Sequence, residues 1–169
     1  MKKQTNKIVI LSVGIVIIAV VILLAMRTTQ PEIVGIKKIA NMGNRHIDTV
    51  DAEHEPYNSN PPTSGPHVGS IASWGVHTEI IPDEKQIHNL EDGGVVVQYN
   101  PDLLPKTEWN VLEDVAIGAG RTHVIVAPRY DMEYVIALTA WNKLLPLDIV
   151  DSEKIQQFIR AYEGIDHHR

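Results

Sequence analysis

The sequence contains no cysteine, so neither a disulfide nor a lipid-modified cysteine can form. It also lacks GxSxG, HExxH, Walker and CxxC motifs, so the common signatures of serine hydrolases, zinc proteases, nucleotide-binding proteins and redox proteins are absent. Basic residues are scarce, with 15 Lys and Arg against 21 Asp and Glu. This balance argues against nucleic acid as a partner.

Long hydrophobic runs are likewise scarce, with one exception at residues 8–26. That run is 19 residues long, close to the roughly 20 that a helix needs to cross a bilayer. Three lysines precede it and only Arg27 follows it, which predicts a cytoplasmic N-terminus at residues 1–7. We therefore expect a single-pass signal anchor in the cell membrane, an extracytoplasmic domain, and an unknown membrane protein as a possible partner.

The chain after the hydrophobic run has the length of one domain. We expect residues 27–43 to be a juxtamembrane spacer, 44–164 the exported domain, and 165–169 a frayed tail containing His167 and His168. Subtracting the three N-terminal lysines from the 15 basic residues leaves 12 against 21 acidic ones, a net charge of −9 from Arg27 onward. An acidic domain of this kind is compatible with cation binding.

Local patterns predict an α+β fold. β-branched runs predict strands at 94–99, 122–127 and 134–141, and the short connection 129–133 predicts that the last two form an antiparallel hairpin. Apolar spacing predicts helices at 107–116 and after an N-capping Ser152. We expect an antiparallel or mixed sheet, two or more helices, and a long ordered loop region rich in Pro, Gly and His at 44–89.

The segment 57–67, YNSNPPTSGPH, is the stiffest part of this loop region. Its prolines fix their own backbone and restrict the residue before each of them, and Ser64-Gly65 supplies a turn. Little backbone entropy is then left to lose when His67 binds a ligand. The alternative is a purely structural corner in which a carbonyl group satisfies this histidine.

A second cluster, HNLEDGG at residues 88–94, leads into the strand at 94–99. In a helical turn His88, Glu91 and Asp92 share one face. Imidazole and carboxylate groups are ligands of Zn²⁺ and Cu²⁺. The cluster therefore predicts metal ligands, although its spacing is not diagnostic.

Three other residues are weaker candidates. His46 and His77, taken singly, are as well explained as hydrogen-bonded surface residues. Met132 lies at the tip of the predicted hairpin, where a thioether either fills a gap against the sheet or acts as a soft ligand for copper, especially Cu⁺.

The segments YNSNPPTSGPH, HNLEDGGVVVQY, APR and IALTAW, in this order, resemble an uncharacterised family of bacterial and archaeal membrane-anchored exported proteins. This numbered domain of unknown function is marked by SNPPTSGPH and HNLEHG, and the resemblance covers residues 43–162. It implies a shared site at His46, His67, His88 and Glu91. The chain departs from the family pattern at two positions. It has Asp92 where the family usually has histidine, and His77 where the family usually has tyrosine. The number of metal ligands therefore stays open.

Three functions are consistent with these patterns. The first is an extracytoplasmic copper- or zinc-binding protein that acts as a chaperone, sensor or store. The second is a non-catalytic interaction module in which the histidines are structural. The third is a metal-dependent hydrolase, with His88 as general base oriented by Glu91.

Overall fold

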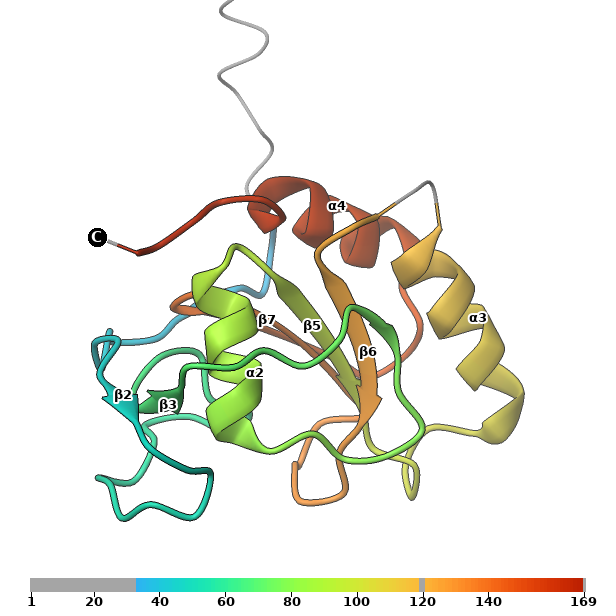
Figure 1. The fold of residues 1–169 in the computed structure, drawn as a ribbon. Coiled ribbons are helices and arrows are strands. Elements are labelled where there is room, and N and C mark those ends of the chain that lie inside the picture. The colour runs from blue at the N-terminus through green and yellow to red at the C-terminus, as the bar shows by residue number, and fades with distance from the viewer. Residues whose placement is uncertain (1–32, 119–120, 169) are drawn as a thin grey trace, which may run out of the picture. The chain divides into compact units, whose positions relative to one another are not determined.

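The structure is a computed structural model that describes residues 33–118 and 121–168. Within these residues one mixed sheet has the strand order β1-β8-β7-β5-β6-β4, and a second, two-stranded sheet pairs β2 with β3 (Figure 1). The helices are α2 (Asp83–Glu91), α3 (Lys106–Ile117) and α4 (Ser152–Tyr162). The strands are β1 (Lys37–Lys38), β2 (His46–Ile47), β3 (His67–Val68), β4 (Gly75–Val76), β5 (Val95–Tyr99), β6 (Val124–Pro128), β7 (Ile136–Ala140) and β8 (Lys143–Leu147).

Both faces of the larger sheet are covered. Val95 and Val97 of β5 point to the face on which α3 and α4 pack, whereas Val96 points to the opposite face and to Ile87 and Leu90 of α2. Because successive side chains of a strand alternate between faces, a strand covered on both sides is apolar at most of its positions. This explains the continuous run of valines, and it fixes α2 firmly against the sheet.

The predicted α+β class with a mixed sheet is confirmed, but the predicted hairpin is wrong. β5 lies between β6 and β7, pairing parallel with the former and antiparallel with the latter. A short connection permits a hairpin, but β5, whose five residues are all buried, gains most by occupying the centre of the sheet. β7 instead pairs with β8, which the sequence analysis missed. The N-cap of α4 is Asp151, not Ser152.

The prediction of an N-terminal transmembrane helix is not upheld. Residues 8–26 lie outside the described residues, and none of the helices within 33–118 and 121–168 is long and apolar enough to cross a membrane. The longest, α3, has 12 residues and spans about 18 Å, short of the roughly 30 Å of a hydrocarbon core. The expected single-pass membrane location, which depended on such a helix, is therefore not supported. Residues 37–38, expected in a spacer, pair with β8 as a strand of the sheet.

Glu163, which follows α4, ties this helix to the start of β6. Its carboxylate accepts hydrogen bonds from the backbone N–H groups of Thr122 and His123, both at 3.0 Å, and from Arg121 at 2.9 Å. Burial alone would raise the pKa of Glu163, but these hydrogen bonds and the Arg121 charge together lower it. The ionised form is thus favoured by folding.

We expect Glu163→Gln to lower the free energy of unfolding by about 1–2 kcal/mol at pH 7. Because the folded-state pKa is lowered, this contribution is complete above the ordinary value of 4.5 and is lost as the pH falls through the folded-state pKa. Urea unfolding at pH 7 and at successively lower pH should therefore show the difference in free energy of unfolding between the wild type and Glu163→Gln becoming smaller. Glu153→Gln, at an exposed position of α4, is the matched control and should cost much less. A difference independent of pH would contradict the charge argument.

Candidate metal site

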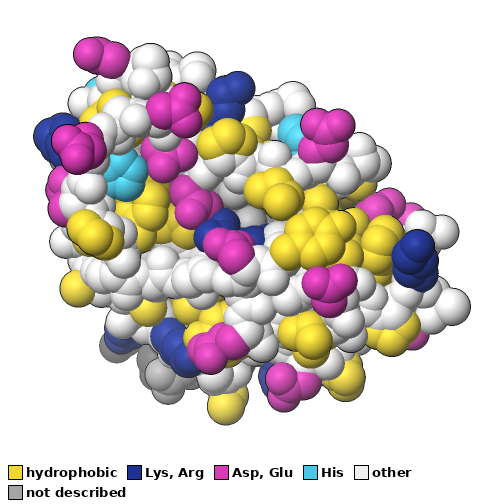
Figure 2. All heavy atoms as spheres, turned by 90° about the horizontal axis from the view of Figure 1, so that it is seen from below, with side chains coloured by type: hydrophobic (Ala, Val, Ile, Leu, Met, Phe, Trp, Pro, Cys, Tyr) yellow, Lys and Arg dark blue, Asp and Glu magenta, His cyan; other side chains and the backbone are white. Residues whose placement is uncertain are grey.

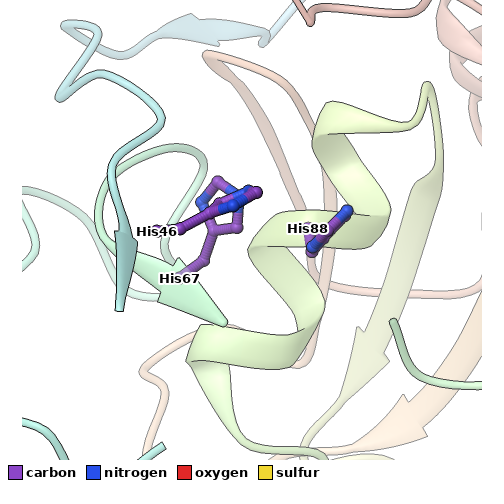
Figure 3. Close-up of side chains that lie close together, drawn as sticks. All are labelled: His46, His67 and His88. Atoms are coloured by element: carbon purple, nitrogen blue, oxygen red, sulfur yellow. The ribbon is translucent and has the colours of Figure 1, made fainter. Parts of the chain in front are cut away.

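Three imidazoles from three separate elements meet beside α2. One ring nitrogen from each of His46, His67 and His88 lies within 4.8 Å of the corresponding nitrogens of the other two. Figure 3 shows the rings of His46 on β2 and His67 on β3 lying next to each other, with His88 on the facing side of α2. We call these three residues the histidine cluster.

The small sheet explains why two of these histidines are neighbours. β2 and β3 are parallel, and His46 is the direct partner of His67 in the register. Side chains at paired positions of a sheet lie on the same face, so the two rings must be close. Their centroids are 4.8 Å apart, and that of His88 is 5.1 Å from the His67 centroid.

The stiff loop before His67 is buried rather than exposed. Residues 61–68 are all buried. The Tyr57 hydroxyl donates a 2.6 Å hydrogen bond to the Pro66 carbonyl, and its ring packs against Gly65, whose φ of +128° is a conformation that favours glycine. The loop therefore fixes the backbone on which His67 stands.

The rings of His67 and His88 are oriented by backbone carbonyl groups. Nδ1 of His67 lies 2.9 Å from the Gly65 oxygen, and Nδ1 of His88 lies 2.7 Å from the Val68 oxygen. A carbonyl oxygen only accepts, so each Nδ1 carries the proton and, in a neutral ring, Nε2 keeps its lone pair. Metal-binding histidines are typically held by such a hydrogen bond on the second nitrogen.

Burial favours the neutral form of the His67 imidazole. Its side chain is fully buried, and this burial lowers the pKa of the imidazole below 6.5, outweighing the Gly65 hydrogen bond and the Glu91 charge, which raise it. The buried Nε2 is therefore an available electron-pair donor.

Glu91 brings a buried carboxylate to the same place. Its side chain is 1% exposed, and Oε2 lies 2.9 Å from Nε2 of His67 and 3.9 Å from Nε2 of His46. Despite the short distance, Nε2 of His67 and Oε2 of Glu91 make no hydrogen bond with any described residue. Two buried atoms with lone pairs facing each other are costly unless a positive charge lies between them.

The spacing of the cluster can be compared with that of a zinc site. With Zn–N distances of about 2.0–2.1 Å, tetrahedral nitrogens lie roughly 3.3–3.4 Å apart. The ligand atoms of the cluster lie within 4.8 Å of one another, so small side-chain movements would bring them to this distance. We refer to the histidine cluster together with Glu91 as the inner site.

The structure brings together all the predicted ligands except two. Asp92, at the C-cap of α2, has Oδ1 3.7 Å from Nε2 of His88. In contrast, His77 follows the edge strand β4, and its Nε2 lies 2.7 Å from the Ser73 carbonyl oxygen. Met132 is buried in an apolar cluster with Ala137 and Leu144, the gap-filling role that the sequence analysis gave as one alternative.

Two residues at the site were missed from the sequence. Asn44 donates a 2.6 Å hydrogen bond from Nδ2 to Oε1 of Glu91. His168, expected in a frayed tail, has Nε2 3.5 Å from Oε2 of the same carboxylate. Neither residue stands in a periodic pattern or a motif, and both reach the site through contacts with residues distant in sequence.

The surface is acidic, as its composition predicts. Figure 2 shows acidic side chains scattered among hydrophobic ones over the face seen from below, with few basic side chains. The formal net charge of the chain is −6. Such a surface attracts cations over distances of about a Debye length.

A family model described as "Protein of unknown function (DUF3105)" matches residues 49–168. The resemblance to an uncharacterised numbered domain is thereby confirmed. Searches among curated proteins and among solved structures found no match.

Proposed function

The chain belongs to the DUF3105 family of proteins of unknown function, and we propose that it is a metal-binding protein that holds a zinc or copper ion at the inner site. Three imidazoles and one carboxylate form a donor set that both metals accept. We infer a role as a metal chaperone, sensor or store.

The observation that carries this proposal is the contact between His67 and Glu91. Two buried atoms, Nε2 and Oε2, are 2.9 Å apart without a hydrogen bond between them. A divalent cation bound to both atoms would satisfy the two lone pairs and compensate the buried negative charge. The carbonyl-anchored Nδ1 atoms of His67 and His88 support the same interpretation, because they leave Nε2 of both rings free for a metal.

The composition of the site favours Zn²⁺ or Cu²⁺ over Cu⁺. A soft thioether would favour Cu⁺, but the only such candidate from the sequence, Met132, packs against Ala137 and Leu144. The donors at the inner site are imidazole nitrogens and carboxylate oxygens, which suit the divalent ions.

Two surface pockets lie apart from the inner site. These pockets on the described surface, of about 290 and 260 Å³, are lined by residues of the segments 71–85 and 129–131. Neither is lined by a residue of the inner site. A substrate bound in either pocket would therefore not contact the ion, as a hydrolase requires.

The proposal predicts saturable binding of Zn²⁺ or Cu²⁺ by the full-length chain after treatment with a chelator. His67→Ala should weaken this binding by at least about 100-fold, because loss of even an outer-shell partner typically costs about 10–100-fold. Competition with a chromophoric chelator measures the affinity, and elemental analysis gives the metal content.

His77→Ala is the matched control, since it removes an imidazole that lies apart from the cluster. It should leave the affinity unchanged. If wild-type protein shows no saturable binding, or if the two variants bind equally well, the inner site is not a metal site and the histidines are structural.

A further inference from the structure

The C-terminal tail, residues 164–168, packs against the end of α2. The N–H of Gly164 donates to the Gly93 carbonyl at 2.8 Å, and the N–H of His167 donates to the Glu91 carbonyl at 2.9 Å. A Cβ atom on Gly93 would lie only 2.7 Å from the nitrogen of Ile165, so the tail fits closely. In Figure 1 it runs from α4 toward the side of the molecule that carries α2 and β2.

This docking presents His168 in the manner of a metal ligand. Its Nδ1 lies 2.8 Å from Oδ1 of Asp166, which orients the ring. Its Nε2 lies 3.4 Å from Oδ1 of Asp92 and 3.5 Å from Oε2 of Glu91. A histidine whose Nδ1 contacts a carboxylate and whose Nε2 faces other donors is the arrangement found in carboxylate–histidine–zinc sites.

His168, Asp92 and His88 form a second group of donors. One ligand atom of each lies within 4.8 Å of the others. We call this group the outer site. It is more accessible than the inner site, because the side chains of Asp92 and His168 are 30% and 42% exposed.

The two groups share His88, and one lone pair on Nε2 can bind only one ion. If two ions are bound, His88 joins the outer site, and the inner ion keeps His46, His67 and Glu91. Each ion then has two imidazoles and one carboxylate. This is a common donor set for zinc that retains an open coordination position.

Glu91 lies where it can serve both ions. Its Oε2 is 2.9 Å from Nε2 of His67, in the inner site, and 3.5 Å from Nε2 of His168, in the outer site. A carboxylate between two cations reduces their mutual repulsion, as in sites with two metals about 3.5–4 Å apart.

We propose that the chain binds a second divalent cation at the outer site, adjacent to the first, through the docked C-terminal tail. This inference rests on the proposed function of the inner site. The outer ion binds more weakly than the inner one, because its ligands are more exposed and the tail must be held in place.

Titration of the metal-free, full-length chain with Zn²⁺ tests the inference. We expect two ions per wild-type chain, bound in two steps. His168→Ala and Asp92→Asn should each reduce the ratio to one and leave the first step intact. Asp92→Asn preserves the size of the side chain, so it removes the carboxylate ligand without the loss of packing that His168→Ala causes. His54→Ala, which removes another histidine near a carboxylate, is the control for adventitious surface binding and should keep the ratio of two.

The outcomes separate the two proposals. A wild-type ratio of one overturns the binding of a second ion; the inner site then stands if His168→Ala keeps that ion and His67→Ala loses it. A ratio of two that persists in both variants also overturns the outer site, since the second ion is then elsewhere. A ratio of zero ends both proposals. As an independent readout, protein loaded with two Cu²⁺ ions should give a spin-coupled electron paramagnetic resonance signal that is absent in His168→Ala.

Discussion

Glu91→Gln is expected to stabilise the metal-free protein and to weaken its metal binding by at least about 100-fold. Glutamine can keep its Oε1 as acceptor for Asn44, and its amide N–H can donate to the lone pair on Nε2 of His67. The substitution therefore replaces an uncompensated contact between two acceptors with a hydrogen bond. We expect the free energy of unfolding of the metal-free protein to rise by about 1–3 kcal/mol.

The metal-bound protein should respond in the opposite direction. A neutral amide is a poorer ligand than a carboxylate and does not compensate the charge of the ion, so metal-dependent stabilisation should largely disappear. Urea unfolding with chelator and with excess Zn²⁺ measures both effects. Asp92→Asn, at a partly exposed carboxylate, is the control for the metal-free protein and should change its stability little. If Glu91→Gln destabilises the metal-free protein, the contact with His67 is an ion pair and needs no metal.

Gly65→Ala is expected to lower both stability and metal affinity. At a φ of +128° a side chain strains the backbone, and the new Cβ would lie 3.0 Å from Cε1 of Tyr57. We expect a loss of about 1–3 kcal/mol in the free energy of unfolding. Because the Gly65 carbonyl orients His67 through Nδ1, a shift of this residue should also weaken metal binding by about 10–100-fold.

Gly75→Ala, on the edge strand β4, provides the matched comparison away from this loop. Gly75 also has a positive φ, of +110°, but a Cβ atom there would meet nothing within 4 Å. It should cost some stability through backbone strain and leave the metal affinity unchanged. Thermal unfolding and competition with a chelator measure the two quantities for both variants. Equal metal affinity in the two variants would mean that the loop does not position His67.

Local sequence patterns predicted much of the secondary structure but not its pairing. The valine run of β5 and the apolar spacing of α3 and α4 were sufficient to predict these elements, because burial of one or both faces requires apolar side chains at fixed intervals. The same patterns could not tell that β5 separates β6 from β7. β8 was overlooked altogether, and Pro146 within it weakens the strand signal.

The available chemistry can be read from the residues alone: imidazoles and carboxylates without cysteine, a stiff loop ending at His67, and His88 and Glu91 within one helical turn. Which of these donors meet depends on how the chain packs. The parallel register of β2 and β3 places His46 beside His67, and the docked tail brings His168 to the site. Met132 is instead buried in a separate apolar cluster. The physical reason is that periodicity records whether a side chain is buried, whereas a metal site depends on contacts between segments far apart in the chain, and those follow from how the sheets and helices pack.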